Sequence, residues 1–114
     1  MMNPDERQFL LTAMWIFMRH GQAERARAIS EALVEENPRD GVAAAAFAEL
    51  LLDDGDSYGA LEVLRTADFP SSLAHAQAVL ETRALRMAGR VAEANSRWAR
   101  YLEAKKGAER KWIA

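Results

Sequence analysis

The stretch GQAERA at residues 21–26 returns in outline as GDSYGA at residues 55–60 and as GRVAEA at residues 89–94, each 34 residues after the last. Every copy begins with glycine and ends with alanine, and Pro4 and Pro38 are also 34 residues apart. Glycine just past a helix supplies the left-handed conformation that ends it, and proline suits the first position of a helix. A small alanine lets two helices approach closely. The period therefore predicts three units, each a helix, a tight turn and a second helix.

Local patterns divide the chain in the same way. Asn3 is a predicted cap of the first helix, with Pro4 at its first position, and Asp40 and Ser57 are predicted caps of the third and fourth helices. The first helix is expected to run to about residue 20, the second from about 23 to 36, the fifth to about 88 and the sixth from about 91 to 105. No segment alternates with period two, so we expect an all-α fold. The units are predicted at residues 7–40, 41–74 and 75–108, with a short C-terminal tail at 109–114.

Composition narrows the possible functions. The 114 residues suffice for a single domain, and a formal charge of −2 gives no strong field for nucleic acid or anionic lipid. Cysteine is absent, and the apolar runs are shorter than the roughly 20 residues that a membrane crossing requires. His20 and His75 have no further ligands at a recognisable spacing for a metal, and the serines have no base in a recognisable arrangement. We therefore expect a soluble protein that is not an enzyme and that has no cofactor and no metal site.

The spacing resembles the tetratricopeptide repeat (TPR). That family places a glycine at the turn, an alanine in the second helix and a proline at the end of each unit. The first unit matches best, with Gly21, Ala26 and Pro38, whereas Glu81 and Thr82 depart from the pattern in the third. The resemblance implies three tandem helix-turn-helix units, about six antiparallel helices, forming a short right-handed solenoid with a concave groove.

A narrower resemblance concerns the YscY or SctY family, TPR chaperones of bacterial type III secretion systems. The chain is similar to this family in QFLL at 8–11, Trp15, GQAERA at 21–26, the pair Asn37-Pro38 and RYLE at 100–103. The resemblance implies a cytoplasmic bacterial chaperone that shields a helical segment of a small secreted protein, SctX or YscX, in a 1:1 complex. It also implies a peripheral role at the export gate of the inner membrane.

In the family pattern, fixed positions of the first helix of each unit face the groove. Mapped onto this sequence, those positions form an apolar surface suited to an amphipathic helix, with Trp15 as an anchor and methionines that adapt to an irregular ligand. The predicted partner-binding residues are Leu11, Trp15, Met18, Arg19, Val42, Ala45, Glu49, Leu52, Val79, Arg83, Arg86 and Met87.

Other interpretations stay open from the sequence. An apolar stripe on a helix is often part of the core, and the first helix is apolar nearly all round, which indicates either a partner or a homodimer contact. A needle-subunit chaperone of the same secretion apparatus is one alternative function. A general TPR adaptor or scaffold that binds a short peptide is another.

Overall fold

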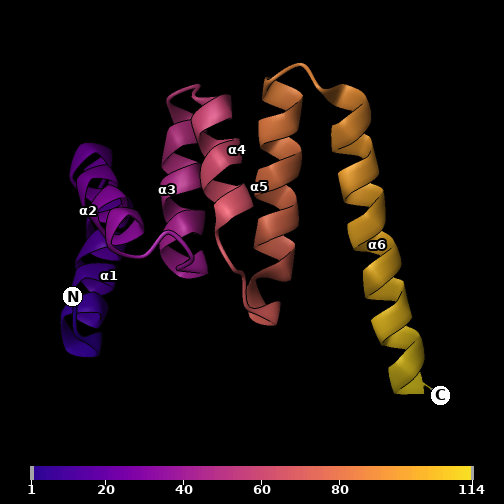
Figure 1. Cartoon of the computed structure of the whole chain (residues 1–114), viewed down its shortest axis with the longest axis horizontal. Helices are drawn as coiled ribbons and strands as arrows, with labels where there is room; N and C mark the ends of the chain where they lie inside the picture. Colours follow the sequence, from indigo (N-terminus) through magenta and orange to yellow (C-terminus); the bar gives the residue numbers. More distant parts are fainter. Residues whose placement is uncertain (1, 114) are drawn as a thin grey trace.

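The computed structural model describes residues 2–113 of the chain and is all-helical, without a strand in that range. Six α-helices and one short 3₁₀ helix follow one another across the molecule (Figure 1). Their bounds are α1 (Pro4–Arg19), α2 (Ala23–Glu36), α3 (Gly41–Asp53), α4 (Ser57–Thr66), η1 (Ser71–Leu73), α5 (Ala74–Met87) and α6 (Val91–Ile113).

Polar side chains begin three of the helices. The side chain of Asn3 accepts a hydrogen bond from the backbone N–H of Glu6, and Asp40 does the same for Ala43 at the start of α3. Both caps were predicted from the sequence. The prediction that Ser57 caps α4 was wrong, because Asp56 accepts the hydrogen bond from Gly59 and Ser57 is a buried first residue of the helix. A carboxylate one position earlier reaches the free N–H groups that a helix leaves at its start.

The three glycines of the repeat share one conformation. Gly21, Gly55 and Gly89 have φ angles of 72°, 83° and 80°, in the left-handed region that favours glycine. At each turn, the backbone N–H of the residue after the glycine donates to a carbonyl five residues earlier, at 2.8 Å in all three cases. This is the Schellman arrangement, which satisfies carbonyls left free at a helix end. The period read from the sequence is therefore a period of backbone geometry.

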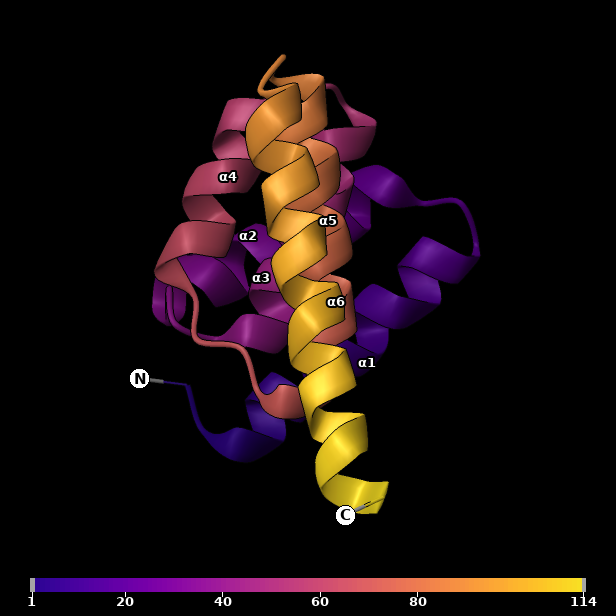
Figure 2. The same cartoon turned by 90° about the vertical axis from the view of Figure 1, so that its right-hand side faces the viewer.

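The helices pack in chain order, each on the next, and α3 also packs on α5. Figure 1 shows α1 and α2 at one end of the molecule and α6 at the other, and Figure 2 shows α6 with no helix in front of it. The alanines of the repeat are fully buried, as their role in close helix approach requires. They are Ala26, Ala60 and Ala94.

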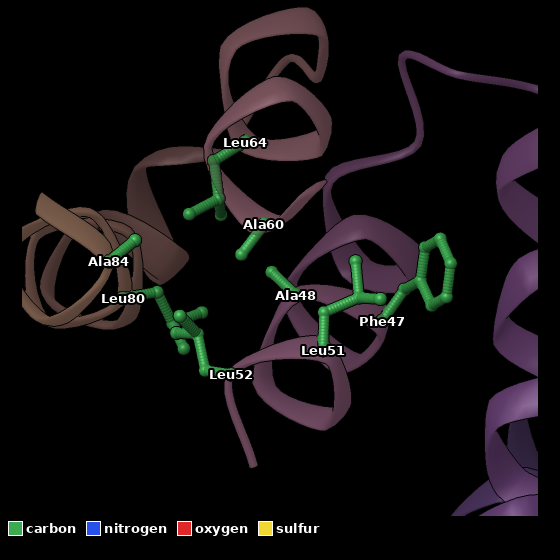
Figure 3. Packing of buried hydrophobic residues seen from close by; sticks show 8 residues of the cluster. All are labelled: Phe47, Ala48, Leu51, Leu52, Ala60, Leu64, Leu80 and Ala84. Carbon is green, nitrogen blue, oxygen red and sulfur yellow. The ribbon is translucent and has the colours of Figure 1, made fainter. Parts of the chain in front are cut away.

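Two clusters of buried side chains form the core. One joins α1 and α2 to α3 and includes the almost wholly buried Met14 and Leu33. The other joins α3 and α4 to α5, where Leu52, Leu64 and Leu80 point toward one another (Figure 3). Because α3 contributes to both clusters, it ties the two ends of the molecule together.

The start of α3 is also held from outside the helix. The segment between α4 and η1 crosses it, and the backbone N–H of Asp68 donates to the carbonyl of Arg39 at 2.9 Å. A side chain at Gly41 would meet the carbonyl oxygen of Asp68 at 2.4 Å, so only glycine fits this crossing. Sequence reasoning missed this role of Gly41, because nothing local distinguishes it from other residues of the helix.

The end of the chain differs from its prediction. The sixth helix was expected to stop near residue 105, with a tail at 109–114, but α6 continues to Ile113. Alanine, lysine, glutamate and arginine support helix through this segment, and Gly107 alone does not break it. Ala114, the last residue of the predicted tail, lies outside the described residues. Among residues 2–113, none of the helices combines the length and the apolar character that a bilayer crossing requires.

Candidate partner-binding groove

A hollow of about 320 Å³ lies across the first helix of each repeat unit. Trp15 and Met18 line it from α1, and Val42, Ala45 and Glu49 line it from α3. From α5 the lining residues are His75, Ala76, Val79 and Leu80. The three helices come together here although they are widely separated in the sequence, because side chains of α3 share one core cluster with α1 and the other with α5. The hollow thus joins predicted groove residues of all three units.

A second hollow of about 480 Å³ continues the first along α5 and reaches α6. Val79 lines both hollows, so the two adjoin at this residue. The second is lined by Thr82, Arg83, Arg86 and Met87, with Trp98 contributed by α6. We call the two hollows together the groove. Its large apolar side chains are Trp15, Met18, Val42, Leu73, Val79, Leu80, Met87 and Trp98.

Several of these apolar side chains are open to solvent. Trp15 is 53% exposed, whereas the adjacent Met14 is fully buried, since consecutive helical residues point about 100° apart. Val79 and Met87 are also exposed on the same side of α5. Leaving apolar area in water forgoes about 25 cal/mol per Å² of burial, and aromatic side chains forgo the most. A partner that covers this surface would recover that free energy.

Charges flank the apolar floor. Arg83 pairs with Asp53 of α3 at 2.9 Å, which links α5 to α3 at one side of the groove. Both side chains are about half exposed, so the pair adds little stability and is weakened by salt. Glu49 and Arg86 are exposed as well. The groove therefore offers both signs of charge around an apolar centre, and it favours an amphipathic ligand over a purely acidic or basic one.

Three of the predicted binding residues do not line the groove. Leu11 and Leu52 belong to the core, so the prediction that they face a partner was wrong. Leu11 packs in the cluster that includes the small Ala43 and Ala46, and Leu52 packs against Leu64 and Leu80 beneath the surface. Arg19 is exposed near the end of α1 but lines neither hollow. The structure brings the remaining predicted residues together along the groove. These are Trp15, Met18, Val42, Ala45, Glu49, Val79, Arg83, Arg86 and Met87.

An aromatic cluster between α5 and α6 was not predicted from the sequence. The rings of His75, Trp98 and Tyr101 have centroids 5.2 to 6.1 Å apart, and His75 Nδ1 lies 3.2 Å from the hydroxyl oxygen of Tyr101. His75 and Trp98 line the groove, one in each hollow. The three-residue spacing of Trp98 and Tyr101 placed them on one helical face, but the histidine beneath them comes from another helix.

Polar groups lie in the α5–α6 contact behind the groove. Glu81 accepts hydrogen bonds from Arg97 and from Gln77, and the Glu81 and Arg97 side chains are largely buried. The hydroxyl oxygen of Thr82 is buried without a hydrogen-bond partner in the described structure. Glu81 and Thr82 are the two residues of the third predicted unit that depart from the TPR pattern. The ion pair is the compensation for Glu81, because a buried carboxylate requires a charged or hydrogen-bonding partner.

Within residues 2–113, there is no group of three or more metal-ligating side chains that could hold a metal ion. Comparison of the sequence with protein-family models found no match, and a search of curated proteins found no similar sequence.

Proposed function

We propose that this protein is a TPR module that binds a helical segment of another protein in the groove. One observation carries the proposal: Trp15, Met18, Val42 and Val79, from three different helices, line one continuous solvent-accessible hollow. Amphipathic helices dock into grooves of this kind through apolar residues spaced three and four positions apart. The anchor is Trp15, because a large aromatic side chain in a pocket gains most from being covered.

The repeat geometry supports assignment to the TPR architecture. Three turns, 34 residues apart, share the same positive φ and the same pair of backbone hydrogen bonds. Repeats of this length that stack only on their neighbours form solenoids, and the first helix of each TPR unit lines the concave face. The groove lies on the corresponding helices, α1, α3 and α5. We therefore interpret the molecule as a short right-handed solenoid of three TPR units.

Within that class, we favour a chaperone of bacterial type III secretion related to the YscY or SctY family. Its client would be a small secreted protein like SctX or YscX, held 1:1 in the cytoplasm and delivered to the export gate at the inner membrane. The support is the similarity at residues 8–11, 15, 21–26 and 100–103 together with the apolar groove. A needle-subunit chaperone and a general TPR adaptor are the alternatives.

The test is co-purification with a co-expressed SctX-like client. Trp15→Ala removes the anchor and Val79→Asp places a charge in the apolar floor, so each should lower client recovery at least tenfold. Tyr58→Ala is the matched control, since Tyr58 is an exposed aromatic residue of α4 outside the groove. Circular dichroism of all three variants checks that the helical fold is retained.

The outcomes separate the possible partners. Loss of the client from both groove variants, with full recovery on Tyr58→Ala, supports the chaperone. Equal recovery on all variants refutes the groove as the binding site. If the SctX-like protein never co-purifies but a needle subunit does, the needle-subunit chaperone takes its place. A short charged peptide whose binding vanishes in high salt would indicate an adaptor instead.

A further inference from the structure

Two large apolar side chains lie on the outer side of α1, away from the groove. Phe9 is 71% exposed and Ile16 is 52% exposed, and they lie two turns apart on one face of the helix. One repeat length later, the corresponding residues are Ala43 and Leu50 of α3. Both are buried in the cluster that joins α3 to α1 and α2. The outer side of α1 is thus the repeat equivalent of a surface that α3 buries against the preceding unit.

The third unit repeats this correspondence at one of the two positions, since its equivalent of Phe9 is the partly buried polar residue Gln77. Two repeat lengths after Ile16 comes Ala84 of α5, which is fully buried in the cluster shared with α3 and α4. In the second and third units, then, this face contacts the unit before it. In the part of the chain that the structure describes, Phe9 and Ile16 have no such cover. Phe9 and Ile16 are larger than their buried repeat equivalents Ala43 and Ala84, so α1 exposes more apolar area on this face than alanines would.

The opposite end of the molecule carries the matching surface. Val34 of α2 packs against both core clusters, and so against the next unit. Two repeat lengths later stands Leu102 of α6, which is 39% exposed. Val91 and Ile113 are exposed as well, each eleven residues from Leu102, which places all three along one line of the helix. Figure 2 shows α6 facing the viewer without a covering helix.

We propose that these two end faces bind each other between copies of this chain, with α6 of one copy packing on α1 of the next. The contact repeats the geometry by which α2 packs on α3 and α4 packs on α5. It uses surfaces outside the groove, so it is independent of client binding.

The charges of the two faces fit this arrangement. Within the chain, Glu36 at the end of α2 is followed closely by Gly41 at the start of α3. Between copies, Ala104 of one chain takes the place of Glu36, two repeat lengths later, and Arg7 of the next chain takes the place of Gly41, one repeat length earlier. The part of α6 beyond residue 104 in one copy therefore passes the first turn of α1 in the next. Lys105 and Lys106 then approach Asp5 and Glu6, and all four side chains are exposed. Opposite charges at a matching position favour this register over its reverse.

The association is heterologous, because two different faces meet. Copies therefore add head to tail, and growth does not stop at a dimer unless the rotation between copies closes a ring. A single helix on a single helix is a small interface, which gives weak and concentration-dependent association. We expect the average mass in solution to rise steadily with protein concentration past that of a dimer.

Sedimentation of two blocked variants, alone and mixed, tests the proposal. Phe9→Glu with Ile16→Glu blocks the α1 face, and Leu102→Glu blocks the α6 face; all three residues are exposed, so the fold should survive. Each variant alone should be a monomer. Their equimolar mixture should form a 1:1 dimer and nothing larger, since one intact face of each kind remains. Tyr58→Glu, on neither end face, should associate as the unaltered chain does.

A charge exchange tests the register. Asp5→Lys with Glu6→Lys should weaken association about tenfold at low salt, and adding Lys105→Glu with Lys106→Glu in the same chain should restore it. The proposal is overturned by an unaltered chain that stays monomeric up to about 1 mM, a concentration at which even a contact with a Kd of about 1 mM would be substantially populated. It is also overturned if the mixture of the two blocked variants stays monomeric. A closed dimer that each blocked variant still forms by itself would overturn it too, because neither variant should associate with its own copies.

Discussion

Helices α3 and α6 occupy opposite extremes of burial. Nine of the thirteen residues of α3 are buried, whereas Ala94 is the one buried residue in the twenty-three of α6. The longest helix is therefore the least covered. The difference shows that the two helices draw on different sources of stability: α3 on the packing of its apolar surface against neighbouring helices, and the outer end of α6 on the helix-favouring residues of its own sequence.

The sequences of the two helices match their surroundings. Helix α3 packs on α2, α4 and α5, and its alanines and leucines leave almost no polar side on the helix. Helix α6 packs along α5, and lysine, arginine and glutamate occupy much of its remaining surface beside the exposed apolar residues Val91, Leu102 and Ile113. A helix that is apolar all round is buried, and one with a broad charged surface faces water. The contrast leads to three expectations, ordered by the size of their effect.

The largest effect is expected from shortening the same side chain in the two helices. Leu52→Ala removes a side chain that is 1% exposed and leaves a cavity between α3, α4 and α5, at a cost of about 2–5 kcal/mol. Leu102→Ala on α6 should cost less than about 1 kcal/mol, because its side chain is already partly in water. Urea unfolding followed by circular dichroism measures both. Equal costs for the two substitutions would contradict the comparison.

The elements of the fold were largely predictable from the sequence. The glycine period is a local property, since a left-handed residue after a helix depends on that residue and its immediate neighbours. The bounds of α2, at Ala23 and Glu36, agree with their prediction for the same reason: Gly21 lies just before the helix and Asn37-Pro38 just after it. Local chemistry decides where these helices begin and end.

The depth of a side chain was less predictable. Leu11 and Trp15 are one turn apart and face the same side of α1, yet one is in the core and the other lines the groove. The distinction depends on which part of α1 packs in the cluster shared with α3, where Leu11 meets residues such as Ala43 and Ala46. The interaction of Glu81 with Arg97 is likewise a product of packing between α5 and α6. A sequence pattern gives direction around a helix but not the position of its neighbours.

A smaller effect, of opposite sign at two sites, is expected from adding one methyl group to a glycine. Gly55 ends α3 with φ 83°, so Gly55→Ala should cost about 1–2 kcal/mol of backbone strain. Gly107 lies within α6, where Gly107→Ala should stabilise by about 0.5–1 kcal/mol. The added methyl group would meet nothing within 4 Å at either site, so packing does not confuse the result.

Thermal and urea unfolding of the two glycine variants measure the difference. If Gly107→Ala has no effect, the end of α6 is already frayed in solution and contributes nothing to the cooperative unit. If Gly55→Ala is neutral, the turn after α3 tolerates another backbone conformation, and the shared geometry of the three turns does not constrain the fold.

The smallest effect concerns how the two helices begin. Asp40 caps α3 and also accepts two hydrogen bonds from Arg7 of α1, at 2.8 and 3.0 Å, with its side chain 7% exposed. The guanidinium of Arg7 lowers the pKa of Asp40 below its ordinary value of 3.8, against the opposing effect of burial. Near the start of α6, Arg90 likewise lowers the pKa of Glu93, but that pair is open to solvent. The two carboxylates differ chiefly in their surroundings.

Asparagine caps a helix as well as aspartate, so Asp40→Asn keeps the cap and removes the charge that pairs with Arg7. The partly exposed Arg7 limits the loss to about 1 kcal/mol at neutral pH. Because the folded pKa of Asp40 lies below 3.8, the unfolded chain takes up the proton first as the pH falls. The stabilisation by Asp40 is therefore complete above about pH 4 and disappears as the pH falls through the folded pKa.

Urea unfolding from pH 7 to pH 2 measures this dependence. The free energies of unfolding of the unaltered chain and of Asp40→Asn should converge at the acid end, while that of Glu93→Gln should follow the unaltered chain throughout. A constant gap across that range would mean that Asp40 acts through its shape and not through its charge.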